Sequence, residues 1–173
     1  MIEQENQNLN TKFNASYEQY SDAIFRYCLF QTSNREKAID ITQDTFIKTW
    51  EYLSRSEKEI ENMRALLYKI AKNLIIDYRR KKKSESLDNL TEQGFDFSDE
   101  KNDMYEKETI FEGKQAFESI NKLDEKYREV IMLRFVEDME IKDIAKALNK
   151  SENNVSVRIH RGLEKLKNIL ENN

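Results

Sequence analysis

The fold of this chain is decided by residues 140–167, EIKDIAKALNKSENNVSVRIHRGLEKLK. The first part predicts a short helix, because apolar residues recur there at helical spacing: Ile141, Ile144, Ala145 and Leu148. Asn149 follows where a tight turn requires positive φ, which asparagine tolerates better than most residues. Ser151 is the predicted N-cap of a second helix. This pattern predicts a helix-turn-helix, whose second helix enters the major groove of DNA.

The second helix of this motif has an apolar side and a polar side. The residues predicted to be buried are Val155, Ile159, Leu163, Leu166 and Leu170. The candidate contacts to DNA are Ser151, Asn153, Asn154, Ser156, Arg158, His160 and Arg161. Asparagine can bond adenine bidentately, and arginine can bond guanine or phosphate. A polar helix face is often merely solvated, but the turn chemistry favours DNA binding. A lone histidine does not favour a metal site.

Two further helices are predicted immediately before this motif. One covers about residues 110–121, and Asp124 is the predicted N-cap of the next. The residues expected to be buried in that next helix are Tyr127, Val130, Ile131 and Phe135. We therefore predict a small helical domain over residues 109–171.

Residues 84–108 predict a flexible acidic linker. They contain nine acidic and two basic residues, together with Gly94 and few large aliphatic side chains. A loop this long is unusual inside one compact domain, so it indicates a boundary between two domains. It is either a solvated spacer or, through Phe95 and Phe97, a docking segment that also repels DNA.

Residues 13–83 predict a second small domain of three helices. The first runs from about Ser16 to Gln31, and Ser33 with Glu36 predicts a capping box at the start of the second. The buried side of the second helix is expected to contain Ala38, Ile41, Thr45, Phe46, Thr49, Trp50 and Leu53. Asn62 is the predicted N-cap of the third, whose apolar stripe contains Leu66, Leu67, Ile70, Ala71, Leu74, Ile75 and Tyr78. The predicted fold is therefore all-α, with two small helical domains.

The third helix is strongly basic. Residues 62–83 contain eight basic residues and one acidic residue, and the run from Arg79 to Lys83 exceeds what a helix dipole requires. Such a segment suits the phosphates of a nucleic acid strand. The alternative is a solvated helix end.

The residue inventory excludes several classes of protein. The chain has one histidine and one cysteine, and it contains neither a P-loop nor an HExxH motif, so we predict no enzymatic activity and no cofactor. Cys28 lies among apolar residues and predicts a buried thiol rather than a redox sensor. No stretch approaches the ~18 apolar residues of a membrane span, so we predict a cytoplasmic protein without membrane insertion.

Three segments, in this order and spacing, resemble the extracytoplasmic-function (ECF) group of bacterial RNA polymerase sigma factors. They are AIDITQDTFIKTW at 38–50, ALLYKIAKNLIIDYRR at 65–80, and the region 123–167. The resemblance covers about residues 13–83 and 110–170. It implies a factor that binds core polymerase and directs promoter recognition, promoter opening and transcription initiation.

The resemblance also implies roles for individual residues. Core polymerase would contact Asp40, Gln43, Asp44 and Lys48. The −10 element would contact Lys72, Asn73, Arg79, Arg80, Lys81 and Lys82. The −35 element would contact the polar face of the helix-turn-helix. The implied partners are core RNA polymerase, promoter DNA and, as for many members of the group, an anti-sigma factor. The rival interpretations are a stand-alone helix-turn-helix regulator and a non-DNA-binding adaptor.

Overall fold

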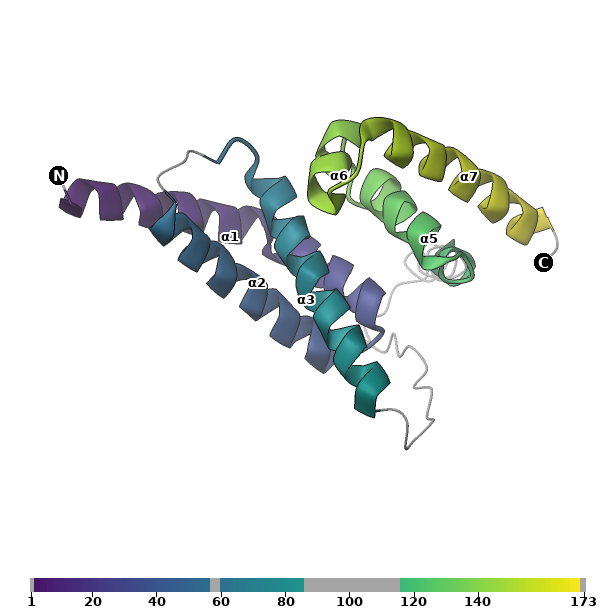
Figure 1. Ribbon diagram of the computed structural model, residues 1–173, viewed down its shortest axis with the longest axis horizontal. Helices are drawn as coiled ribbons and strands as arrows, with labels where there is room; N and C mark the ends of the chain where they lie inside the picture. Colours follow the sequence, from purple (N-terminus) through teal and green to yellow (C-terminus); the bar gives the residue numbers. More distant parts are fainter. Residues whose placement is uncertain (1, 57–59, 86–115, 172–173) are drawn as a thin grey trace, which may run out of the picture. The chain divides into compact units, whose positions relative to one another are not determined.

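The computed structural model describes residues 2–56, 60–85 and 116–171, and every regular element in these ranges is a helix. The chain divides into two compact units. The first contains α1 (Ile2–Thr32), α2 (Arg35–Arg55) and α3 (Met63–Glu85) (Figure 1). The second contains α5 (Glu125–Ile131), the π-helix η1 (Met132–Val136), α6 (Ile141–Leu148) and α7 (Glu152–Glu171). The predicted all-α fold is confirmed. Residues 86–108 of the predicted linker lie outside the described ranges.

The core of the N-terminal unit lies where α1, α2 and α3 pack together. Ile24, Tyr27, Leu67 and Tyr68 are fully buried there. The rings of Tyr27 and Tyr68 meet edge to face, with centroids 5.2 Å apart. The predicted stripe of α3 omitted Tyr68, although the stripe's Leu67, Ala71 and Ile75 are buried as expected.

Four aromatic side chains fix the crossing of α1 and α2. The ring of Phe13 contacts those of Phe46 and Trp50, with centroids 6.3 and 5.1 Å away. Tyr17 contacts Phe46 at 4.8 Å. Phe46 is buried, which confirms that it packs the domain core.

The junction between α1 and α2 differs from the prediction. Ser33 is not the N-cap of α2: it adopts a left-handed conformation, φ 51°, and ends α1 by donating its N–H to the carbonyl of Leu29. Asn34 is the N-cap, and its side-chain oxygen accepts from the N–H of Lys37 at 2.9 Å. The predicted capping box was wrong because Ser33 is used for the turn between the two helices, which moves the N-cap of α2 to Asn34. The helix α1 begins at Ile2, earlier than the predicted start near Ser16. Once a helix has formed, each added residue gains a hydrogen bond at the cost of ordering only that residue, so a helix extends easily beyond its packed part.

The other predicted caps have mixed outcomes. The side chain of Asn62 accepts from the N–H of Ala65 at 2.8 Å, which confirms the cap of α3. Asp124 stands at the N-cap position of α5, but its side chain makes no capping hydrogen bond. Its backbone carbonyl instead accepts from the N–H groups of Tyr127 and Arg128.

The C-terminal unit has its core between α5 and α7. Leu123, Tyr127 and Ile131 are buried there, and the partly buried Ile120, Ile159, Leu166 and Ile169 pack against them. Gly162 is buried at the closest approach, where a Cβ would lie 3.0 Å from Cγ1 of Ile131. The prediction that Leu163 and Leu170 are buried was wrong: they are exposed, because the contact line of α7 passes through Gly162 and Ile169 instead.

The π-helix η1 overturns a second burial prediction. A π-helix hydrogen bond spans five residues, as between the N–H of Glu137 and the carbonyl of Met132. The wider turn rotates the following side chains away from α-helical positions. Met132 and Leu133 are therefore buried, whereas Phe135, predicted to be buried, is 56% exposed.

Candidate nucleic-acid and polymerase interfaces

The helix-turn-helix has the local geometry that its sequence predicts. Asn149 adopts φ 52°, and Lys150 donates its N–H to the carbonyl of Ala145 at 2.9 Å. The hydroxyl of Ser151 accepts from the N–H of Asn154 at 3.2 Å, which confirms the predicted N-cap of α7. Val155 is fully buried and anchors the first turns of α7. The turn therefore holds the start of α7 in a fixed direction.

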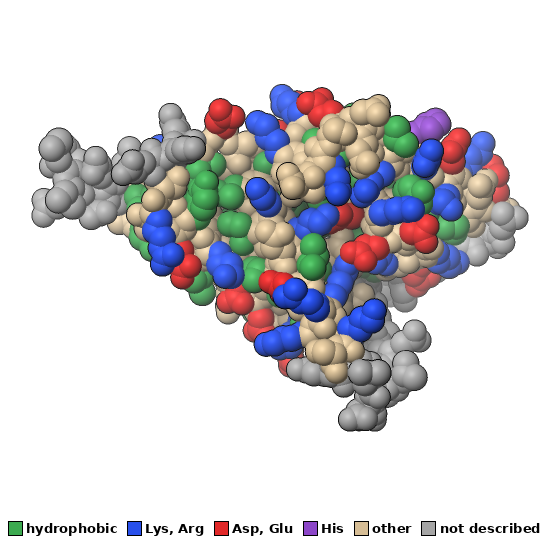
Figure 2. Space-filling model, viewed as in Figure 1, with side chains coloured by type: hydrophobic (Ala, Val, Ile, Leu, Met, Phe, Trp, Pro, Cys, Tyr) green, Lys and Arg blue, Asp and Glu red, His purple; other side chains and the backbone are tan. Residues whose placement is uncertain are grey.

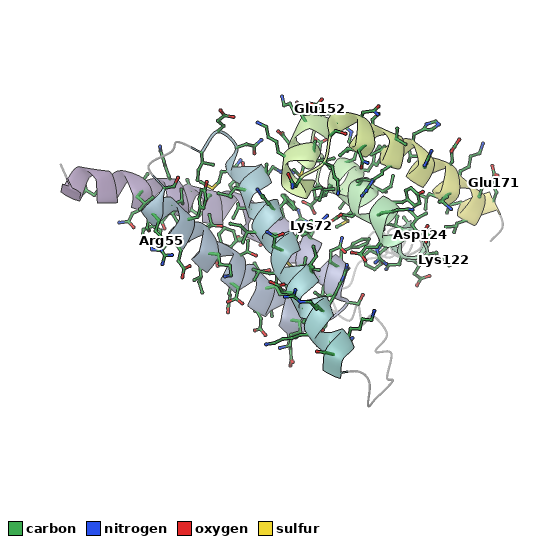
Figure 3. The ribbon with its side chains drawn as sticks, in the orientation of Figure 1. Arg55, Lys72, Lys122, Asp124, Glu152 and Glu171 are labelled. Atoms are coloured by element: carbon green, nitrogen blue, oxygen red, sulfur yellow. The ribbon has the colours of Figure 1, made fainter. Side chains whose placement is uncertain are left out.

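The polar residues predicted to contact DNA lie together along α7 and its cap. Arg158 is half-buried and the others are exposed: Ser151, Asn153, Asn154, Ser156, His160 and Arg161. Glu152 begins the helix at the same end (Figure 3). His160 lies 3.5 Å from the carboxylate of Glu164 on the next turn. The N-terminal half of α7 thus presents amide, hydroxyl and guanidinium groups, which are the groups that read base edges and phosphates.

The basic residues of α3 form a second exposed surface, and Figure 2 shows Lys and Arg side chains gathered around the C-terminal end of this helix. Lys72 is half-buried (labelled in Figure 3), and Asn73 is exposed. Arg80 is exposed and bonds Asp77 at 2.9 Å. Lys81, Lys82 and Lys83 are also exposed.

Arg79 differs from its basic neighbours. Its Nη2 donates to the backbone carbonyl of Gln31 at 2.8 Å and to the side-chain oxygen of Gln31 at 2.7 Å. The guanidinium therefore connects α3 with the end of α1. Its predicted contact with DNA remains a prediction.

Sequence reasoning missed two exposed residues on the same side of α3. Lys69 is exposed, and Ile76 is 46% exposed. Ile76 is three or four residues from Lys72, Asn73 and Arg80, and Lys69 is three or four residues from Lys72 and Asn73, so both share a face with these residues. That spacing was the available signal, but Ile76 was included neither in the predicted apolar stripe nor among the predicted DNA contacts.

A third surface lies on the exposed side of α2. The four residues predicted to contact polymerase, Asp40, Gln43, Asp44 and Lys48, are all exposed. Asp40 accepts from Lys37 Nζ at 3.1 Å, and this hydrogen bond raises the pKa of Lys37. Ile39 and Ile47 were missed by the sequence reasoning, and Ile47 is 55% exposed. We call these six residues the α2 face: Ile39, Asp40, Gln43, Asp44, Ile47 and Lys48.

Neither a metal site nor a membrane-spanning helix is found among the described residues. No group of three or more His, Cys, Asp or Glu side chains is placed to hold a metal ion there. None of the helices in that part of the chain is long and apolar enough to cross a membrane.

Comparison with known proteins identifies the family. The Sigma-70 region 2 model matches residues 16–85, which include α2 and α3, and the Sigma-70 region 4 model matches residues 115–166, which include the helix-turn-helix. The chain is 31% identical over 160 residues to the ECF RNA polymerase sigma factor SigW of Bacillus subtilis, covering 87% of this chain and 84% of SigW. The chain belongs to the ECF RNA polymerase sigma factor family. This sigma factor is also 26% identical over 151 residues to the ECF RNA polymerase sigma factor SigM of the same organism, covering 87% of this chain and 90% of SigM.

Solved structures share the fold of this sigma factor. CnrH, in complex with the cytosolic domain of CnrY, matches with a TM-score of 0.69 and 23% identity, covering 95% of this chain and 90% of that one. The sigma factor RpoE, in complex with the anti-sigma factor NepR from Bartonella quintana, matches with a TM-score of 0.75 and 21% identity, covering 92% and 97%. Family membership does not favour the alternative of a stand-alone regulator.

Proposed function

We propose that this ECF sigma factor binds core RNA polymerase through the α2 face and directs it to promoters through two DNA-binding surfaces. Residues 13–83 would serve the polymerase and the −10 element, residues 109–171 the −35 element, and residues 84–108 would form the linker. The observation that carries the proposal is the presence of three exposed surfaces of different chemistry within the two matched sigma regions. The protein acts by binding and performs no catalytic step.

The α2 face suits a protein partner. Two acidic residues, Asp40 and Asp44, lie one helical turn apart, and the exposed Ile39, Gln43 and Ile47 form a parallel row at the same spacing. Apolar side chains next to charged ones are a common composition of protein interfaces. The acidic residues would select a basic surface of the polymerase, and the isoleucines would supply buried apolar area.

The basic surface of α3 suits a separated promoter strand. Lys72, Arg80, Lys81 and Lys82 would contact phosphates, which gives salt-dependent affinity. Arg79 was predicted to act with them, but it also bonds Gln31. Asn73 is exposed on the same helix and can hydrogen-bond a base. Binding a single strand in this way would stabilise the opened promoter.

The polar face of α7 suits duplex DNA at the −35 element. Asn153, Asn154 and Ser156 lie in its first turns and would reach base edges, with Ser151 at the cap. Arg158, His160 and Arg161 lie further along, where contacts to phosphates or bases are possible. Two weak surfaces on one tethered chain bind more tightly than either alone, because the first contact raises the effective concentration of the second.

An anti-sigma factor is the third partner that we propose. The similar sigma factor RpoE was solved in complex with the anti-sigma factor NepR. Such a partner would act by covering the α2 face or the DNA-binding surfaces. We further propose that the protein works in the cytoplasm, where the polymerase is.

The test is reconstitution with sigma-free bacterial core polymerase. We expect the full chain to co-elute with core polymerase on size exclusion and to produce promoter-specific run-off transcripts from genomic fragments. The variant Asp44→Lys on the α2 face should abolish co-elution, whereas Asp22→Lys, at an exposed position of α1, should not. Failure of the wild-type protein to co-elute, with sequence-specific duplex binding by the protein alone, would favour the stand-alone regulator.

A further inference from the structure

The last turns of α3 carry much of the positive charge of this helix but have little packing of their own. Among the α3 residues up to Ser84, Ile75 is the last that is fully buried, and Tyr78 is half-buried. Residues 80–84 are all exposed. A helix end without buried side chains frays, and its side chains then sample many directions. A contact near residue 79 therefore decides how well the basic end is ordered.

Arg79 makes that contact. Its Nη2 donates two hydrogen bonds to Gln31, one to the backbone oxygen at 2.8 Å and one to the side-chain oxygen at 2.7 Å. The two residues are 48 positions apart in the sequence. Nη2 has two hydrogens, so both are used. Gln31 is buried, and its Nε2 has no hydrogen-bond partner. Its oxygen therefore faces the guanidinium, although its own amide hydrogens stay unsatisfied.

The contact also satisfies the end of α1. The last turn of α1 contains no basic residue, and the final carbonyls of a helix need donors from elsewhere. Ser33 donates to the carbonyl of Leu29, the hydroxyl of Thr32 to that of Cys28, and Arg79 to that of Gln31. A cation at this end is also favoured by the helix dipole. Arg79 is thus the cationic cap of α1, supplied by α3.

We propose that Arg79 is a positioning residue: by bonding Gln31 it fixes the direction of the basic end of α3, so that its basic side chains reach the DNA strand from fixed positions, with Arg80 and Lys83 on the same side of the helix. This inference rests on the proposed function of α3. It assigns Arg79 a role different from a phosphate contact. Gln31 of α1 shares this role, because it accepts the hydrogen bonds that hold Arg79 in place.

The decisive variant is Gln31→Met, which removes the side-chain acceptor, keeps an unbranched side chain of similar length and changes no charge. Arg79→Met removes the donor, and Lys81→Met is the matched control that removes an exposed charge. Hydrogen exchange of the full-length protein should show faster exchange at residues 80–85 in Gln31→Met and Arg79→Met, but not in Lys81→Met. Unchanged protection in Gln31→Met would overturn the inference.

The functional measurement is binding of fluorescent single-stranded dT25 over a series of KCl concentrations. We expect Gln31→Met to lower the affinity about three- to tenfold without changing the slope of log K against log [KCl]. The slope should fall by about 0.7 in Lys81→Met, which removes a phosphate contact. The double variant Gln31→Met/Arg79→Met should bind no more weakly than Arg79→Met alone.

The outcomes separate this inference from the proposed function. Normal dT25 affinity in Gln31→Met, or additive losses in the double variant, would mean that Arg79 contacts phosphate and would overturn the inference. Absence of dT25 binding by the wild-type protein, with exchange still accelerated in Gln31→Met, would remove the proposed DNA role of α3 and with it the positioning role. The hydrogen exchange result would then still report the contact itself.

Discussion

Cys28 shows how burial sets the chemistry of a single residue. It is fully buried in α1, and desolvation raises the pKa of its thiol to about 12, partly offset by a hydrogen bond involving Thr42. A thiol reacts as its thiolate, so a raised pKa makes it inert. The sequence-based interpretation of Cys28 as a buried thiol is confirmed, since apolar neighbours on a helical stripe predict burial directly.

The same burial predicts a pH dependence of stability. The pKa of Cys28 in the folded chain lies above its ordinary value of 9.0, so folding favours the protonated thiol. This contribution is complete below about pH 9 and is lost as the pH rises towards 12. Relative to Cys28→Ala, the wild-type N-terminal unit should lose about 1 kcal/mol of stability per pH unit above 9. Urea unfolding followed by Trp50 fluorescence measures this, and parallel pH profiles would contradict it.

At the scale of single helices, sequence reasoning succeeded where apolar side chains marked a face. It found the buried sides of α2 and α3 and the turn before α7. It failed on α7 because a glycine gives no hydrophobic signal: Leu163 stands beside Gly162 and fits the same helical spacing. Which of the two residues is buried depends on where Ile131 of α5 lies against α7, and this packing of two helices is not visible in the local sequence. Phe135 failed because a π-helix changes the period on which the prediction relied.

This correction of α7 predicts that substitution of Gly162 destabilises the protein more than substitution of its neighbour Leu163. Gly162→Ala gains about 1 kcal/mol of helix propensity, but its Cβ would lie 3.0 Å from Ile131 and 3.4 Å from Tyr127 Cβ. Overpacking costs about 1–3 kcal/mol, so we expect a net destabilisation of about 1 kcal/mol. Leu163→Ala should cost at most about 0.5 kcal/mol, because Leu163 is 41% exposed. Hydrogen exchange of α7 amides checks both, and a larger effect for Leu163→Ala would restore the sequence-based assignment.

The α2 face predicts where binding energy concentrates. A few residues that become well buried often supply most of the affinity of an interface. We expect Ile47→Ala to weaken binding of core polymerase about tenfold or more, measured by fluorescence anisotropy of the labelled sigma factor. Ile76→Ala is the matched control, since Ile76 is exposed to a similar degree on α3. Equal effects of the two variants would argue against a dedicated role for Ile47.

At the scale of the whole molecule, charge is segregated along the chain. The net charge is −4, yet residues 62–83 contain eight basic residues and one acidic residue, whereas residues 84–108 contain two basic and nine acidic. Such alternation was visible in the sequence, as was the division into two helical units. The contact between Arg79 and Gln31 was not visible, because it joins residues far apart in the chain and depends on how α1 and α3 cross.

The acidic segment predicts an effect on initiation. Replacing its acidic residues by Asn and Gln should reduce run-off transcription at equal occupancy of core polymerase, because the segment would then no longer be repelled by DNA. A scrambled segment of the same length and composition is the matched control and should retain activity. Loss of activity in the scrambled variant would instead favour a docking role for Phe95 and Phe97.

The residues of α7 that pack against the domain differ from those that face DNA in the proposed function, so the DNA-facing residues can be changed without altering the packing. Val155, Ile159, Gly162, Leu166 and Ile169 lie on its packed side, whereas Asn153, Asn154, Ser156 and Arg161 are exposed. A library randomised at those four exposed positions should therefore fold as well as the parent. New promoter preferences could be selected from it directly, and the same independence would let duplicated genes diverge in target without passing through unstable proteins.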